Sequence, residues 1–442
     1  MGSYIPSTHE EQASMLAAIG CKNMEELFAV VPQAMLLKEP LNLPAGLSEI
    51  EVRRTMEAIA DKNIIFKSIF RGAGAYNHYI PAIVKSVSTK EEFLTAYTPY
   101  QAEISQGILQ SIFEYQTMIC ELTGMDASNA SVYDGASAAA EAVAMCKERS
   151  RIKALISATT HPDVIETVRT YCDGAGTELI VVPAKDGVTD ISALSELLNS
   201  DTSCFLVQQP NYYGILEDAQ ELGEAVHTAG AKYIMCCNPM TLAVLKTPAE
   251  YGADIAVGDG QPFGMEMAFG GPYLGYMAAQ SAVSRKLPGR IVGETVDIEG
   301  KRAFVLTLQA REQHIRREKA SSNICSNQAL CALTAAAYLA AMGQSGLCEV
   351  AEQCSSKAHY LAKELEKIGF KLRFNGEFFH EFVTSSPAPV EEVMQALEKK
   401  NILGGYPLSG ELSGCILWCT TEQNTKAEMD GLVTILKEVC GK

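Results

Sequence analysis

The sequence predicts an α/β fold built on a mostly parallel sheet with helices on both faces. The first observation is a regular alternation, between residues 154 and 278, of short apolar strand-like segments and amphipathic helical segments. This alternation requires right-handed crossovers and is typical of parallel sheets buried on both faces. The second observation is a change beyond Gly346 to longer helices and isolated strands, which predicts a small C-terminal α/β domain.

The amino-terminal part, residues 1–95, is predicted to form an arm of helices and extended connectors. Apolar residues recur at helical spacing over residues 10–19 and 48–61, and proline-containing connectors lie between them. The same spacing over residues 107–123 and 134–146 predicts the helices that begin the main domain.

The main domain is predicted over residues 96–325. Its strands are expected at residues 154–157, 178–182, 204–207, 233–237, 255–257 and 273–278, and its helices at 164–171, 191–198 and 219–229. Sheets of this kind bind ligands at the carboxyl ends of their strands. The loops that follow the strands are therefore the place to look for chemistry.

The C-terminal part, residues 326–442, is predicted to hold a connector helix and a small α/β domain. The connector is the Ala- and Leu-rich segment 327–342, which is apolar nearly all round and therefore expected to be buried. The domain itself should contain helices at 350–368, 390–400 and 426–439 and strands at 371–374, 381–383 and 415–419.

Composition excludes several classes of partner. A net charge of -17 over 442 residues argues against binding to nucleic acid or to an anionic membrane surface. No run approaches eighteen apolar residues, so no membrane span is expected. The 14 cysteines make no CxxC pairs, which predicts free thiols, no metal site and a cytoplasmic location.

Three groups of residues remain as candidates for binding. His161 follows a predicted strand end, where it could contact a ligand or simply lie in a surface loop. His78 lies with Arg71 and Tyr76 in an aromatic loop that could bind a ligand or pack on a partner. The basic segment 311–319 could bind a carboxylate or phosphate, or form a charged helical face. No P-loop, GxGxxG or GxSxG motif accompanies these residues.

A missing lysine is the most informative feature of the main domain. Residues 253–264 predict a buried strand that runs into a turn. Aminotransferase-like enzymes of fold type I, which this design resembles, place at that turn the lysine that forms a Schiff base with pyridoxal phosphate. Here the position holds Gln261, and no lysine lies between Lys246 and Lys286. An amide nitrogen is not basic and cannot form the imine.

A second position points the same way. Enzymes of this design keep an acidic residue at an earlier strand end, where it pairs with the pyridinium nitrogen. The predicted strand 233–237 is followed instead by Asn238, a neutral amide. Together with Gln261, this change predicts that the chain's own cofactor pocket is vestigial.

Longer motifs resemble one family over essentially the whole chain. Residues 97–107, 113–118, 121–125 and 309–325 resemble glycine decarboxylase, the P protein of the glycine cleavage system. The length is about half that of the single-chain form and fits one subunit of the split, two-subunit form.

The resemblance implies an alpha2beta2 heterotetramer in which the other subunit carries the lysine and the pyridoxal phosphate. The implied reaction decarboxylates glycine and transfers the remaining aminomethyl group to the lipoyl arm of the H protein. This chain would bind no cofactor covalently and would hold no complete catalytic set of its own. It would still contribute side chains to the partner's active site, for which the candidates are Arg71, Tyr76, His78, Tyr97, Tyr100 and Gln101.

Two alternatives stay open at the level of sequence. The chain could be a self-sufficient pyridoxal-phosphate decarboxylase or aminotransferase that uses another lysine, such as Lys246 or Lys286. It could also be a non-catalytic scaffold that retains the fold as an interaction module.

Overall fold

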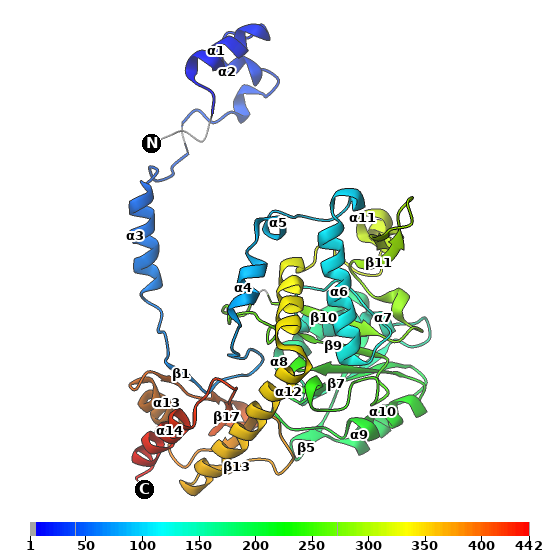
Figure 1. Cartoon of the computed structure of the whole chain (residues 1–442), viewed down its shortest axis with the longest axis vertical. Coiled ribbons are helices and arrows are strands. Elements are labelled where there is room, and N and C mark those ends of the chain that lie inside the picture. Colours follow the sequence, from blue (N-terminus) through cyan, green and yellow to red (C-terminus); the bar gives the residue numbers. More distant parts are fainter. Residues whose placement is uncertain (1–5, 40, 272, 442) are drawn as a thin grey trace. The chain divides into compact units, whose positions relative to one another are not determined.

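The computed structural model describes residues 6–39, 41–271 and 273–441. The chain divides into two compact units, one ending at Ile65 and one running from Phe66. The first unit contains α1 (His9–Ala18), α2 (Met24–Leu27) and α3 (Glu49–Ala60) (Figure 1). Reciprocal capping boxes begin α1 and α3, in which a Ser or Thr is paired with a Glu three residues on. Neither helix contains a buried residue.

The larger unit is organised around a seven-stranded sheet in the order β2-β10-β9-β8-β7-β3-β4. The strands are β2 (Ala127–Ser128), β10 (Gly275–Ala279), β9 (Ile255–Asp259), β8 (Lys232–Cys237), β7 (Thr202–Gln209), β3 (Lys153–Ser157) and β4 (Glu178–Val182). The five strands from β9 to β4 are parallel to one another, and β10 and β2 are antiparallel additions at one edge. The predicted, mostly parallel sheet is therefore confirmed.

Each face of this sheet carries its own apolar core. Adjacent residues Cys236 and Cys237 of β8 belong to different buried clusters, as the two-residue period of a strand requires. The cluster around Cys237 includes Tyr115 and Tyr338, and the cluster around Cys236 includes the alanines of α7. The covering helices are α6 (Gln106–Thr123), α7 (Gly135–Cys146), α8 (Pro162–Ala175), α9 (Ile191–Leu197), α10 (Ala219–Thr228) and α12 (Ala329–Lys367).

Helix α12 agrees with the sequence prediction of two helices in this region. Its 39 residues comprise two helical stretches that meet at a kink at Gly343. Gly343 has φ 60° and ψ -177°, a non-helical conformation that glycine adopts without a Cβ clash, so the first helical stretch ends there and the second begins directly after it. By length and composition alone, α12 is long and apolar enough to cross a membrane, a property that it shares with core helices of soluble proteins.

The C-terminal layer has a four-stranded sheet in the order β13-β14-β17-β16. Trp418 is fully buried at its centre, against α13 and α14. Strand β1 pairs in parallel with β15, which connects residues 68–69 to this layer. The bounds are β1 (Ser68–Ile69), β13 (Lys371–Leu372), β14 (Glu381–Ser385), β15 (Ile402–Leu403), β16 (Tyr406–Pro407), β17 (Cys415–Cys419), α13 (Val390–Glu398) and α14 (Lys426–Val439).

Several elements were not expected from the sequence. The most prominent is a hairpin, β11 (Ile291–Val296) with β12 (Arg302–Thr307), which packs on α6. The basic segment 311–319 forms only the single-turn helix α11 (Gln313–Arg316), flanked by 3-10 turns, rather than an extended helical face. Short elements complete the unit: α4 (Ala82–Ser88), α5 (Glu91–Leu94), β5 (Ala184–Lys185) and β6 (Val188–Thr189).

Candidate functional site

A cavity of about 320 Å³ opens at the carboxyl ends of the parallel strands, where the fold predicts a ligand site. We call it the central cavity. Residues following β8 and β9 form one wall, and the first turn of α7 forms another. Its polar lining residues are Tyr76, Asp134, His161, Asp163, Thr167, Gln208, Asn238, Asp259 and Tyr273.

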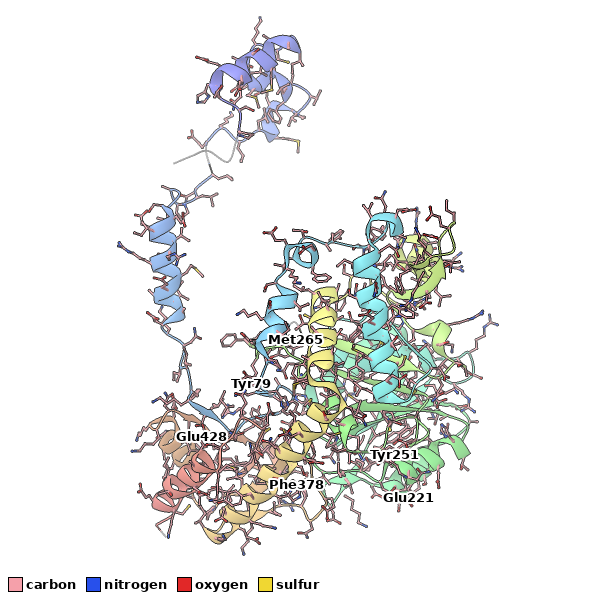
Figure 2. All side chains as sticks on the ribbon, in the orientation of Figure 1. Tyr79, Glu221, Tyr251, Met265, Phe378 and Glu428 are labelled. Atoms are coloured by element: carbon pink, nitrogen blue, oxygen red, sulfur yellow. The ribbon has the colours of Figure 1, made fainter. Side chains whose placement is uncertain are left out.

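Gln261, at the position of the missing lysine, is 1% exposed and fully engaged inside the chain. Its Oε1 accepts from the backbone N–H of Tyr76 at 2.9 Å, and its Nε2 donates to the Tyr76 carbonyl at 2.9 Å. The same Nε2 donates to the carbonyl of Met265 at 2.8 Å; Met265 is labelled in Figure 2. The side-chain amide thus bonds both backbone groups of Tyr76 in the loop 71–81, as the backbone of a neighbouring β-strand would. A position that could anchor a cofactor instead anchors a loop.

Asn238 begins the 3-10 turn that follows β8. Its Oδ1 accepts from the backbone N–H of Met240 at 3.0 Å, which fixes the orientation of the amide. Its Nδ2 therefore donates a hydrogen bond to Nε2 of His380 at 3.2 Å, and this imidazole nitrogen is the acceptor. Burial, and the nearby His78, lower the pKa of His380 well below its ordinary value, and the ring is therefore neutral. No carboxylate takes the place of Asn238 to pair with a pyridinium.

The first turn of α7 is closed by carboxylates of the chain itself. Asp134 accepts from the N–H of Ser137 at 2.7 Å, and Asp259, at the end of β9, accepts from the N–H of Gly135 at 3.0 Å. A Cβ on Gly135 would lie 2.9 Å from the backbone nitrogen of Asp259, so only glycine permits this approach. Burial raises the pKa of Asp259 to about 6, and the hydrogen bonds from Gly135 and Gln261 oppose that rise.

These residues do not fit pyridoxal phosphate. A helix N-terminus at this edge of a sheet is a good phosphate site because its N–H groups are free and its dipole attracts anions. Here Asp134 and Asp259 already accept from two of those N–H groups and add carboxylates beside them. Gln261 cannot form an imine, and Asn238 offers no charge to a ring nitrogen.

His161, the third predicted pocket residue, lines the central cavity and begins α8. Its Nδ1 accepts from the N–H of Asp163 at 3.1 Å, which leaves Nε2 protonated to donate to the carbonyl of Ala73 at 3.0 Å. Its ring meets Tyr212 edge-on at 4.9 Å between centroids. Both ring nitrogens are therefore satisfied within the chain.

Tyr76 connects the central cavity to the C-terminal layer. Its hydroxyl donates to Oε2 of Glu381 at 2.8 Å, and the other Glu381 oxygen accepts from the N–H of Ala73 at 2.7 Å. Burial raises the pKa of Glu381 to about 7, against the lowering effect of these two hydrogen bonds.

Arg71 does not reach the cavity. It donates to the carbonyls of Gly404 and Gly405 at 3.1 and 3.0 Å.

His78 is buried in a small cluster with Glu422 and Cys354. Its Nδ1 lies 2.7 Å from Oε2 of Glu422, and the Cys354 thiol donates to the same oxygen at 3.5 Å. Two ligands on a tetrahedral zinc ion lie about 3.3 Å apart, given metal bonds of about 2.0 Å. The shorter distance between His78 and Glu422 is that of a hydrogen bond. The cluster therefore attaches the loop 71–81 to Glu422 by hydrogen bonding.

The remaining predicted donors lie elsewhere. Tyr97 is 85% exposed and Tyr100 is 56% exposed, and Gln101 is also exposed. Tyr97 lines a second cavity of about 290 Å³ together with Arg290 and the first turn of α12. The six predicted donors thus divide into an exposed group and a group inside the fold, in which Tyr76 and His78 are buried and Arg71 is half-buried. Their role toward a partner stays a prediction.

Sequence reasoning missed four residues that shape these sites: Asp134, Asp259, Glu381 and Arg290. Asp134 and Asp259 had a readable signal, since each stands directly before a helix or at a strand end. Glu381 and Arg290 had none, because their importance comes from burial that only the tertiary structure creates.

Comparisons with known proteins agree on one family. A family model described as the glycine cleavage system P-protein matches residues 2–436. A protein of Carboxydothermus hydrogenoformans, named probable glycine dehydrogenase (decarboxylating) subunit 1, is 50% identical over 439 residues, covering 98% of this chain and 99% of its own. The same name is carried by a relative from Moorella thermoacetica, 50% identical over 442 residues, covering 99% of both chains.

Solved structures give the fold. The crystal structure of a glycine decarboxylase P-protein in inhibitor-bound form is similar with a TM-score of 0.93 at 42% identity, covering 99% of this chain and 100% of that chain. An alanine–glyoxylate aminotransferase from Nostoc sp. shares the fold with a TM-score of 0.59 at 16% identity, covering 92% and 98%. The predicted aminotransferase-like fold of type I is confirmed.

Proposed function

Because the chain belongs to the glycine cleavage system P-protein family, we propose that it acts as subunit 1 of glycine dehydrogenase (decarboxylating), completed by a subunit 2. The observation that carries this proposal is similarity over the whole chain to relatives named subunit 1, combined with the buried amide of Gln261. The family is one of pyridoxal-phosphate enzymes. We propose that subunit 2 holds the cofactor, since the central cavity of this chain does not suit it.

Neither Lys246 nor Lys286 supports the alternative of a self-sufficient pyridoxal enzyme. Lys246 is exposed and lies over the ring of Tyr251 at 5.8 Å. Lys286 is exposed and donates to the carbonyl of Met145 at 3.0 Å. Neither residue lines the central cavity.

In the proposed enzyme this chain binds, orients and encloses rather than reacts. Gln261 fixes the loop 71–81 against the end of β9, and Glu422 holds the same loop through His78. The segment that contains Tyr97, Tyr100 and Gln101 remains exposed and is available to a second subunit. We propose that this segment enters the partner's active site and helps to shape the space in which glycine reacts.

The finer assembly is part of the same proposal. We propose an alpha2beta2 heterotetramer that passes the aminomethyl group to the lipoyl arm of the H protein. We also propose a cytoplasmic location, because all 14 cysteines are free thiols and nine of them lie in the apolar cores or at their edges rather than in a disulfide framework.

Reconstitution from purified subunits tests the proposal. This chain alone, subunit 2 alone and the mixture are each supplied with pyridoxal phosphate, lipoylated H protein and carboxyl-labelled glycine. Release of labelled carbon dioxide should require both subunits. Full activity of subunit 2 alone would contradict the proposal and favour a scaffold role, and activity of this chain alone would favour a self-sufficient enzyme.

A further inference from the structure

Arg290 is a buried cation without an ionic partner. It is 5% exposed, and no other lysine or arginine among the described residues is buried to that degree. No carboxylate of the described chain lies within ion-pair distance of it. An isolated charge in a protein interior is strongly unfavourable unless it is paired. The burial of Arg290 therefore favours an anionic partner from outside the described chain.

The hydrogen bonds of Arg290 are also incomplete. A guanidinium has five N–H groups, and two of the Arg290 donors have acceptors: Nη1 donates to Oδ1 of Asn327 at 2.9 Å and Nη2 to the hydroxyl of Tyr100 at 3.4 Å. Its Nε is buried without a partner. Asn327 is itself oriented, because its Nδ2 donates to the hydroxyl of Ser131 at 3.2 Å. The guanidinium is thus held in one orientation while most of its donors remain unused.

The second cavity gives an anion access to this group. It measures about 290 Å³ and is lined by residues 96–99, Arg290 and residues 326–331, with no Asp or Glu among them. Helix α12 begins in its wall, and its N-cap residue Gln328 makes no side-chain capping bond. The first-turn N–H groups of such a helix point outward and favour an anion. We call this space the Arg290 cavity.

We propose that the Arg290 cavity is a binding site for an oxyanion, a carboxylate or a phosphate group, held by Arg290, Tyr100 and the first turn of α12. This proposal rests on the proposed function, in which the oxyanion belongs to a molecule in the partner's active site. Its source is either the carboxylate of the amino-acid substrate or the phosphate of the cofactor. The exposed Tyr97 and Tyr100 beside the cavity then enclose the bound molecule rather than forming a general docking surface.

The first experiment uses this chain alone and does not depend on its enzymatic role. Thermal unfolding is measured in sodium acetate, in sodium phosphate and in sodium chloride of equal ionic strength, for the wild type, Arg290→Met, Arg290→Lys and the control Arg302→Met. Arg302 is an exposed arginine of β12 that pairs with Glu294. At least one oxyanion should raise the midpoint of the wild type and of Arg302→Met by about 2–4 °C over chloride.

Arg290→Met should abolish that rise while its midpoint in chloride equals or exceeds that of the wild type, because an unpaired buried charge has been removed. Arg290→Lys, which keeps the charge but loses the planar fork, should retain part of the response. The proposal is overturned if neither anion stabilises the wild type, or if Arg290→Met responds as the wild type does.

The second experiment distinguishes the two sources in the complex with subunit 2. If the substrate carboxylate is bound, Arg290→Met should raise the KM for glycine about tenfold or more and leave the affinity for pyridoxal phosphate unchanged. If the cofactor phosphate is bound, the Kd for pyridoxal phosphate should rise instead. Unchanged values of both would overturn the assignment to the partner's active site, whereas an inactive wild-type complex would overturn only the proposed function.

Discussion

The central cavity and the Arg290 cavity differ in how their polar groups are satisfied. Around the central cavity, Gln261, Asn238 and His161 each have hydrogen-bond partners within the chain. Around the Arg290 cavity, a buried guanidinium keeps most of its donors unused, and a helix begins without a side-chain cap. The central cavity lies where this fold binds a cofactor, but its side chains do not suit one. The Arg290 cavity offers N–H donors that suit an oxyanion.

This difference teaches that polar groups beside a cavity can either stabilise the fold or stay available to a ligand. Gln261 stabilises the fold, because its amide pairs with the backbone of Tyr76. Arg290 keeps N–H donors that could still bind a ligand. Stability measurements and binding measurements should therefore separate the two cavities.

The largest effect on stability is expected from Gln261→Met. The methionine removes the partners of the Tyr76 N–H and carbonyl groups while keeping similar volume, and unpaired buried groups each destabilise by about 1–3 kcal/mol. The free energy of unfolding in urea should fall by about 3 kcal/mol. The control is Gln220→Met on the exposed face of α10, which should change stability by less than about 0.5 kcal/mol. A near-neutral Gln261→Met would break the view that this amide holds the loop.

Of similar size is the pH dependence that Glu381 introduces. Its pKa is about 7 in the folded chain against an ordinary value of 4.5, so the folded chain holds a proton that the unfolded chain releases between those pH values. Stability should therefore fall as pH rises from about 4.5 to about 7, by up to about 1.4 kcal/mol per pH unit for this one group. Glu381→Gln should remove this part of the slope in chemical unfolding at several pH values. An unchanged slope would show that Glu381 ionises normally.

A smaller effect is expected from Tyr76→Phe. The substitution deletes only the hydroxyl that donates to Glu381, and loss of such a hydrogen bond to a buried carboxyl destabilises by about 1–2 kcal/mol. It should also raise the pKa of Glu381 further, since a donor to its charged form is lost. Tyr79→Phe, at a tyrosine that is 62% exposed, provides the matched control and should behave as the wild type. Equal midpoints for the two variants would contradict the assigned contact.

The smallest effect on stability, and a large one on activity, is expected from Tyr97→Ala. Tyr97 is 85% exposed, so its removal should change the free energy of unfolding by less than about 0.5 kcal/mol. In the complex with subunit 2, the same variant should lower kcat/KM for glycine by about tenfold, as loss of an enclosing aromatic group does. Wild-type kinetics would remove Tyr97 from the proposed contributors.

The sequence was sufficient for the architecture because strand and helix periods are local properties. The alternation between residues 154 and 278 predicted the parallel strands, and the absence of lysine between Lys246 and Lys286 drew attention to Gln261. The sequence could not indicate that Arg71 would turn to the carbonyls of residues 404 and 405, since that contact joins segments more than 300 residues apart. The burial of Arg290 was equally unreadable, because it depends on the hairpin β11–β12 and on the start of α12.

The most direct test of the central claim is the location of the cofactor in the assembled enzyme. The complex of both subunits is saturated with pyridoxal phosphate, reduced with borohydride and digested, and the pyridoxyl-lysine peptides are identified by mass spectrometry. Our account predicts that every modified peptide at stoichiometric yield comes from subunit 2. A stoichiometric pyridoxyl-lysine in this chain, at Lys246, Lys286 or any other position, would contradict it.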